Sequence, residues 1–121
     1  MKVDGIKNCC NVDSEEIKRL KNVLSNLYDN TELNERTEIF KALTDPTRLQ
    51  ILYLLKFRDL YVCELTEVLD KPQSTISHHL NILKRVGFIK SSKEGIWTLY
   101  GLKNQDIIAL VDNLCEKIKN D

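Results

Sequence analysis

Residues 70–87 read DKPQSTISHHLNILKRVG. A turn containing proline comes first, and apolar residues at helical spacing follow it, which predicts a helix from about Ser74 to Val86. Gly87 stands where a helix commonly ends in a left-handed cap. Three apolar side chains fall within one narrow arc of this helix and are expected to pack against the preceding helices: Ile76, Leu80 and Leu83.

The opposite arc carries short hydrogen-bond donors and acceptors and a cation. Such groups suit base edges and phosphates in the major groove of DNA, and the positive end of the helix dipole favours nearby phosphates. The alternative is a polar face that is merely solvated. His79 lies at the edge of the buried arc and is interpreted as a hydrogen-bonded packing residue. The predicted DNA contacts are Gln73, Ser74, Thr75, Ser77, His78, Asn81 and Arg85.

Charge is distributed unevenly along the chain. The 121 residues include 18 basic and 18 acidic side chains, so the formal net charge is zero. Residues 70–93 nevertheless hold five basic side chains and one acidic one, a local net charge of +4. A polyanionic partner would meet this segment, which favours DNA over a merely solvated face.

A central helix and a β-hairpin are predicted on either side of this segment. Asp45 and Pro46 form a start signal for a helix whose residues 49–55 are apolar nearly all round, so that helix should be central. Residues 88–91 and 96–102 are rich in β-formers and flank a polar turn, which predicts a hairpin. Its tip is expected to reach phosphates of an adjoining groove through Lys90 and Lys93.

Amphipathic helices are expected at the two ends, over residues 13–28 and 106–119. Residues 1–12 lack a helical period and are interpreted as a flexible arm on a single domain spanning 13–121. The predicted fold class is mainly α (α+β): a winged helix-turn-helix with about five or six helices and a two-stranded β-hairpin wing. No run approaches the roughly 20 apolar residues of a membrane span and no secretory signal is evident, so a cytoplasmic protein is expected.

Two stretches resemble one family of regulators. Residues 40–52, FKALTDPTRLQIL, resemble the entry signature of the ArsR–SmtB type of metal- and arsenic-sensing winged-helix repressors, and residues 73–83, QSTISHHLNIL, resemble their recognition helix. The resemblance covers about residues 35–102. It implies a homodimer joined through the terminal helices. It also implies a repressor that binds a palindromic DNA operator and leaves it when an inducer binds.

The cysteines suggest the inducer. In many members of this family two thiolates separated by one residue begin the first helix of the DNA-binding pair; here Cys63 matches the second position and Tyr61 stands at the first. Another subgroup, similar to cadmium and lead sensors, adds cysteines from an N-terminal arm, where this chain has Cys9 and Cys10. Thiolates suit Cd(II), Pb(II), Zn(II) and As(III), so these three cysteines are the predicted metal ligands.

Other readings of these features stay open. Cys63 could be a small buried packing residue, as free cysteines often are, and Cys115 could pack in the dimer interface. Reversible thiol oxidation is the rival inducer. The closing helix offers carboxylates without a histidine, which argues against the family's other common metal site. A winged-helix module for protein assembly is a second function, whereas no motif predicts an enzyme.

Overall fold

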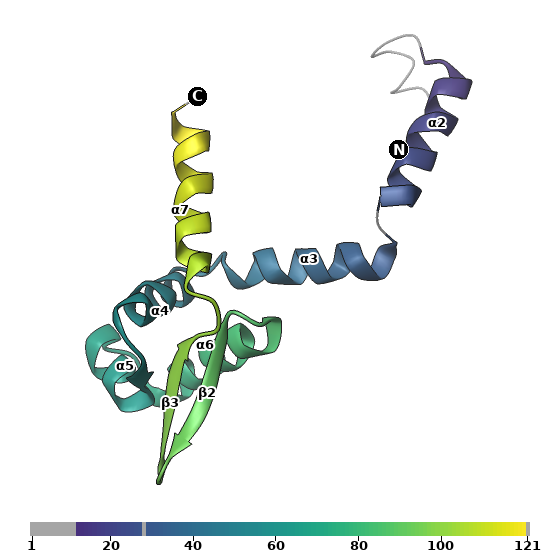
Figure 1. The fold of residues 1–121 in the computed structure, drawn as a ribbon. Helices are drawn as coiled ribbons and strands as arrows, with labels where there is room; N and C mark the ends of the chain where they lie inside the picture. Colours follow the sequence, from purple (N-terminus) through teal and green to yellow (C-terminus); the bar gives the residue numbers. More distant parts are fainter. Residues whose placement is uncertain (1–11, 28, 121) are drawn as a thin grey trace. The chain divides into compact units, whose positions relative to one another are not determined.

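The computed structural model describes residues 12–27 and 29–120, and it confirms a winged helix-turn-helix in a mainly α chain (Figure 1). Three strands form one antiparallel sheet in the order β1-β3-β2. The elements of this described part are α2 (Ser14–Leu27), α3 (Asn30–Ala42), α4 (Pro46–Phe57), β1 (Leu60–Tyr61), α5 (Val62–Leu69), α6 (Gln73–Val86), β2 (Ile89–Glu94), β3 (Trp97–Leu102) and α7 (Asp106–Lys119).

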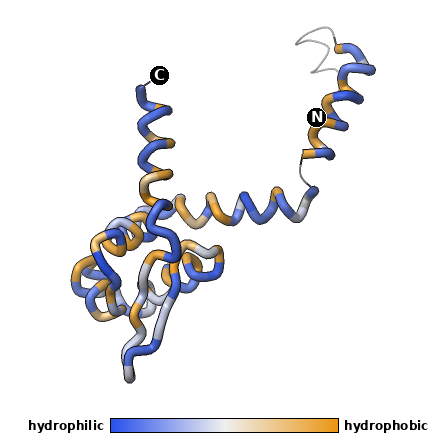
Figure 2. The backbone as a smooth tube through the Cα atoms, viewed as in Figure 1, coloured by the Kyte–Doolittle hydropathy of each residue, from blue (hydrophilic) through white to orange (hydrophobic). Residues whose placement is uncertain are grey.

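The chain divides into two compact units, residues 1–37 and 38–121. In the first unit, α2 begins as predicted, because the carboxylate of Asp13 accepts a hydrogen bond from the backbone N–H of Glu15 at 3.0 Å. Apolar positions recur along α2 (Figure 2), yet none of its described residues is buried, and Leu24 is 64% exposed. In the single chain this apolar face of α2 is exposed, so its burial in a homodimer, which the resemblance implies, stays a prediction.

The core of the second unit is built around α4, as its apolar sequence predicts. Ile51, Leu52 and Leu55 are fully buried there. Side chains from the neighbouring helices, β2 and α7 meet them, and removal of this apolar surface from water is the main stabilising contribution. The other large side chains that are fully buried in the described residues are Leu65, Ile76, Leu80, Leu83, Ile89 and Ile108.

The start of α4 is held by a side-chain cap. Asp45 is extended, and its Oδ1 accepts hydrogen bonds from the backbone N–H groups of Thr47 at 2.7 Å and Arg48 at 3.2 Å. Burial alone raises the pKa of Asp45, but the backbone N–H groups of Arg48 and Thr47 outweigh it, so the pKa is lowered. Its contribution to stability is therefore present above the unfolded-state pKa of about 3.9 and is lost as the pH falls through the folded-state value.

Asp45→Ala is expected to lower the free energy of unfolding by about 1 kcal/mol, because two N–H groups at the helix start lose their acceptor. Asp45→Asn should keep most of the stability, since the amide oxygen still accepts. Urea unfolding followed by circular dichroism measures both variants. An alanine variant as stable as the wild type would show that the cap contributes nothing.

The wing is longer and its turn tighter than predicted. β2 pairs with β3 from Ile89 opposite Leu102 to Glu94 opposite Trp97, so the turn consists of two residues only. The first of these is Gly95, with φ at 67°, a conformation that suits a two-residue hairpin turn. The predicted turn over 92–95 is wrong because the strand pairing continues through polar residues. Lys90, opposite Gly101, therefore lies near the base of the hairpin and not at its tip.

A third strand, β1, was not predicted because two residues are too short to show a period. Leu60 pairs with Tyr100 and Tyr61 with Leu99. The next residue after Tyr61 is Val62, the first residue of α5, so β1 joins this helix to the sheet without a linker. The sheet consequently connects the wing to the first turn of α5.

The last helix, α7, buries one residue, Ile108. Three large apolar side chains farther along it are exposed: Leu110, Leu114 and Ile118. They recur at helical spacing and so form an exposed apolar stripe on α7. Within the described residues, every helix is too short or too polar to cross a membrane.

Candidate nucleic-acid interface and thiol site

The helix α6 is anchored by its apolar arc and turns its polar arc outward. Ile76, Leu80 and Leu83 are fully buried, as predicted. The helix ends at Gly87, whose φ of 97° confirms the left-handed cap and whose N–H donates to the carbonyl oxygens of Leu83 and Lys84. Among the polar side chains predicted to contact DNA, Thr75 and Ser77 are half-buried, and the exposed ones are Gln73, Ser74, His78, Asn81 and Arg85.

The wing is tied to the end of this helix. Lys84 Nζ donates a hydrogen bond to Ser91 Oγ at 2.7 Å, joining the last turn of α6 to β2. Lys90 and Lys93, the two predicted phosphate contacts, lie exposed on β2. The structure thus brings the seven candidates of the α6 segment onto one element and places the two lysines on the strand attached to it.

His79 is a hydrogen-bonded packing residue, as predicted. It is 9% exposed, and its Nδ1 lies 3.0 Å from Nη1 of Arg48, which comes from α4. A guanidinium only donates, so Nδ1 accepts and the imidazole is neutral. Burial lowers the pKa of His79, and of its charged neighbours Asp45 opposes this whereas Arg48, His78 and Lys71 add to it.

Arg48 also holds the end of α3. Its Nε donates to the carbonyl oxygen of Ala42 at 2.8 Å, and its Nη2 donates to that of Lys41 at 3.4 Å. One guanidinium therefore connects the last carbonyl groups of α3, the start of α4 and the buried side of α6. This arrangement could not be predicted from the sequence, because His79 lies 31 residues further along the chain than Arg48.

Cys63 is the second residue of α5 and is exposed, so its interpretation as a buried packing residue is wrong. Tyr61, the residue in the family's other thiolate position, ends β1. Cys115 on α7 is also exposed in the single chain. Cys9 and Cys10 lie outside the described residues. Within the part of the chain that the structure describes, no group of three metal-ligating side chains is assembled. Of the three predicted ligands, Cys63 is the one that lies in this part.

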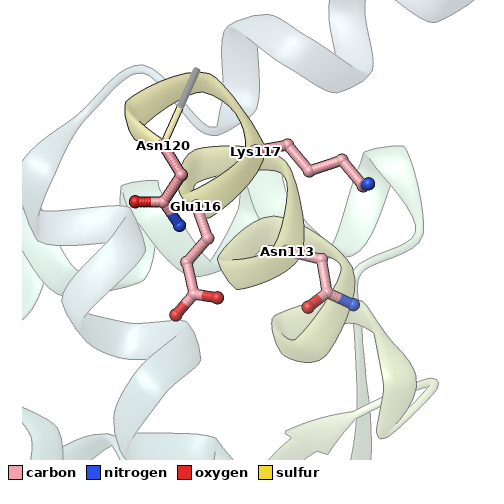
Figure 3. A pocket seen from close by; sticks show the side chains of 4 residues that line it. All are labelled: Asn113, Glu116, Lys117 and Asn120. Carbon is pink, nitrogen blue, oxygen red and sulfur yellow. The ribbon is translucent and has the colours of Figure 1, made fainter.

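One carboxylate of α7 is hydrogen-bonded to α4: Asp112 accepts a hydrogen bond from the Tyr53 hydroxyl at 2.5 Å. This bond, together with burial and the charge of Asp112, raises the pKa of Tyr53 to about 12. Glu116 lines a polar pocket of about 510 Å³ with Asn113, Lys117 and Asn120 (Figure 3). Three of the four come from α7, and Asn120 directly follows its last residue.

A second hollow, of about 360 Å³, lies between α6 and the wing, and we call it the wing hollow. Trp97 is 53% exposed beside it and meets Tyr61 edge-on, with ring centroids 6.4 Å apart. Neither aromatic residue was predicted to line a site, although the sole tryptophan, two residues after the turn glycine, was a signal. The lining residues are Tyr61, Val62, Cys63, Gln73, Ser77, Ile96, Trp97, Thr98 and Tyr100.

Comparisons with known proteins agree with this geometry. The family model described as "Bacterial regulatory protein, arsR family" matches residues 45–91. An uncharacterized HTH-type transcriptional regulator of Methanocaldococcus jannaschii is 53% identical over 81 residues, which cover 64% of this chain and 91% of that protein. The cadmium resistance transcriptional regulatory protein CadC of Listeria innocua is 34% identical over 102 residues, covering 84% of this chain and 82% of that protein.

A solved structure shows the same fold. The homodimeric winged helix-turn-helix DNA-binding domain Mb0332 of Mycobacterium bovis, described as a possible ArsR-family transcriptional regulator, has a TM-score of 0.67 and is 27% identical. The match covers 74% of this chain and 88% of that one.

A helix-turn-helix that presents a polar helix face beside a β-hairpin wing defines a winged-helix DNA-binding protein. Relatives more than 30% identical are covered over most of their length, and all of those named are transcriptional regulators. The chain belongs to the arsR family of bacterial regulatory proteins and is a DNA-binding transcriptional regulator.

Proposed function

We propose that this regulator is a repressor that leaves its operator when a thiophilic metal or metalloid ion binds. The observation that carries the proposal is the placement of the exposed thiol of Cys63 in the same hollow as Gln73 and Ser77 of α6. A ligand on that thiol would lie beside the helix that reads DNA. The named role of the Listeria relative in cadmium resistance supports this choice of inducer.

In this proposal α6 enters the major groove, with its first turns at the base edges. Serine, threonine, asparagine and glutamine side chains exchange hydrogen bonds with bases, and arginine contacts guanine or phosphate. Lys90 and Lys93 on β2 contact phosphates and contribute affinity with little sequence discrimination. The proposed base and phosphate contacts from α6 are Gln73, Ser74, Thr75, Ser77, His78, Asn81 and Arg85.

We propose that the regulator acts as a homodimer through its terminal helices. The exposed apolar side chains of α2 and of α7 are the surfaces that a second copy would cover. The homodimeric Mycobacterium bovis domain supports this assembly. Two recognition helices in one dimer would bind half-sites about one DNA turn, roughly 34–36 Å, apart. We propose that the protein regulates transcription by binding DNA and is not an enzyme. We also propose that it acts in the cytoplasm.

Cys9, Cys10 and Cys63 are the proposed ligands. Sulfur donors favour Cd(II), Pb(II), Zn(II) and As(III) over harder ions. The carboxylates of α7 are a poor alternative, because the helix has no histidine and Asp112 is already hydrogen-bonded to Tyr53. By reciprocal linkage, bound DNA has to weaken ion binding by the same factor by which the ion weakens DNA binding.

Replacing Cys9, Cys10 and Cys63 together by serine should leave DNA binding intact and abolish release by the ion. The probe is a duplex that the protein selects from a random-sequence pool, followed by fluorescence anisotropy in titrations with Cd(II), Zn(II) and As(III). The matched control is Cys115→Ser, which removes an exposed thiol from α7. The ions should still release this variant from the duplex. Ultraviolet absorption bands from sulfur-to-metal charge transfer should appear when the control binds an ion and should be absent from the triple variant.

Three outcomes would contradict parts of the proposal. Release of the triple variant by the ions would reject the thiolate site. Release by hydrogen peroxide in the presence of a chelator, with no response to the ions, would favour thiol oxidation. A failure to bind any duplex, or binding that does not fall steeply with salt, would reject the DNA interface and favour an assembly module.

A further inference from the structure

The wing hollow lies between the two elements that the proposed function assigns to DNA. Gln73 and Ser77 line it from the first turns of α6, and Trp97 and Thr98 line it from β3. Adjacent major and minor grooves of a duplex are separated by one sugar–phosphate strand. A helix in one groove and a wing at the next therefore straddle that strand, and the strand has to pass between them.

The chemistry of the lining suits a sugar–phosphate strand. Thr98 and Gln73 bring a hydroxyl and an amide that can donate hydrogen bonds to phosphate oxygens. The rings of Tyr61 and Trp97, fixed edge-on to each other, offer an apolar wall for deoxyribose. None of the described residues that line the hollow carries a carboxylate.

The acidic side chain nearest to Cys63 in the sequence is held by other hydrogen bonds. Glu64 follows Cys63, but its carboxylate accepts hydrogen bonds from Arg58 Nη2 at 2.7 Å and from the backbone N–H of Tyr61 at 3.0 Å. Arg58 offsets its charge, and its hydrogen bonds tie it to the segment before the helix. The start of α5 therefore presents backbone N–H groups and the Cys63 thiol, and the carboxylate of Glu64 is already paired. A phosphate at this helix start would meet no unpaired negative charge from Glu64.

We propose that the wing hollow seats one sugar–phosphate strand of the bound DNA and that the Cys63 thiol lies against that strand. The inference rests on the proposed DNA-binding function and deepens it. An adduct on Cys63 and the strand occupy the same space, so ligand and DNA exclude each other directly. Release then needs no change in the spacing of the two recognition helices of a dimer.

Thiol labelling in the full-length chain tests this. In the Cys9→Ser/Cys10→Ser variant, the rate of N-ethylmaleimide addition is measured by mass spectrometry at Cys63 and Cys115, with and without the duplex selected from a random pool. DNA should slow labelling of Cys63 by about tenfold or more, because the reagent reaches a covered thiol only while DNA is dissociated. Labelling of Cys115, the matched thiol outside the hollow, should not respond to DNA.

Side-chain size at the same position gives a second test. Cys63→Trp should lose about tenfold or more in affinity for the duplex relative to the wild type, since the bulky ring fills the seat. Glu67→Trp, an exposed position of α5 that does not line the hollow, is the control and should bind normally. Circular dichroism verifies that each variant folds.

Equal labelling of Cys63 with and without saturating DNA would overturn the proposal, and so would normal binding by Cys63→Trp. In either case DNA is still bound, so the proposed function survives. If no duplex is bound at all, the proposed function fails and this inference fails with it.

Discussion

Arg85→Ala and Ser77→Ala are each expected to abolish tight operator binding while leaving the protein folded. Both side chains lie on the outward arc of α6 and are far less buried than Ile76, Leu80 and Leu83 on the other side. A good side-chain contact to a base contributes about 1–3 kcal/mol of discrimination. A homodimer loses each contact twice, so the expected loss is roughly 2–6 kcal/mol, which corresponds to between about thirtyfold and twenty-thousandfold in affinity.

The two variants should lose DNA binding in different ways. Removal of the Arg85 charge should weaken binding to all sequences and reduce the dependence of affinity on salt, if Arg85 contacts phosphate. Removal of the Ser77 hydroxyl should weaken binding to the selected duplex more than to unrelated DNA. Lys56→Ala, which removes an exposed cation from α4, is the control and should bind almost normally. Unchanged binding by both α6 variants would show that the recognition face is assigned wrongly.

Arg48→Ala is expected to destabilise the fold severely. The guanidinium donates to the carbonyl oxygens of Ala42 and Lys41 and to Nδ1 of His79. Ala42 and His79 are buried, so their acceptors would lose a partner that water cannot easily replace. Each unsatisfied buried acceptor costs about 1–3 kcal/mol, and the total of roughly 2–6 kcal/mol is a large part of the 5–15 kcal/mol typical of a small domain.

The same contact makes stability depend on pH. The folded state lowers the pKa of His79, so the unfolded state binds the proton more readily. Stability from this group is therefore fully present above the unfolded-state pKa of about 6.5 and is lost as the pH falls toward the folded-state value. Protonation would also turn Nδ1 from an acceptor into a donor facing the Arg48 guanidinium.

Urea unfolding between pH 7.5 and 5, the range around the ordinary histidine pKa of roughly 6.5, measures this dependence. His79→Gln should flatten the decline in stability. His78→Gln is the matched control, because His78 is exposed on the same helix and should leave the decline in place. Arg48→Lys should rescue only part of the loss, since an ammonium cannot reproduce the planar fork that serves three acceptors. A wild-type stability in Arg48→Ala would show that the junction is dispensable.

The parts of the fold that were predictable depend on local signals. The start at Asp45 and Pro46 and the left-handed Gly87 each follow from neighbouring residues. The burial of His79 was predictable from helical angle, whereas its partner Arg48 was not, since a contact across the core leaves no trace in a single sequence. β1 was missed because two residues have no period, and the wing turn was misplaced because pairing extended through polar side chains.

The candidate site was predictable in the same uneven way. The polar arc of α6 follows from spacing alone. The exposure of Cys63 does not, because the nearby apolar residues Val62 and Leu65 suggested burial. The pairing of Tyr61 with Trp97 depends on β1 lying beside β3, so the wing hollow could not be inferred before that strand was known.

The short strand β1 has a mechanical consequence for the regulator. Its two residues hydrogen-bond to β3 and pass directly into the helix that carries Cys63. With no slack between them, a displacement of the first turn of that helix must either drag the hairpin along or break its edge pairs. If a ligand binds Cys63 as proposed and displaces the first turn of that helix, it would therefore also move the wing.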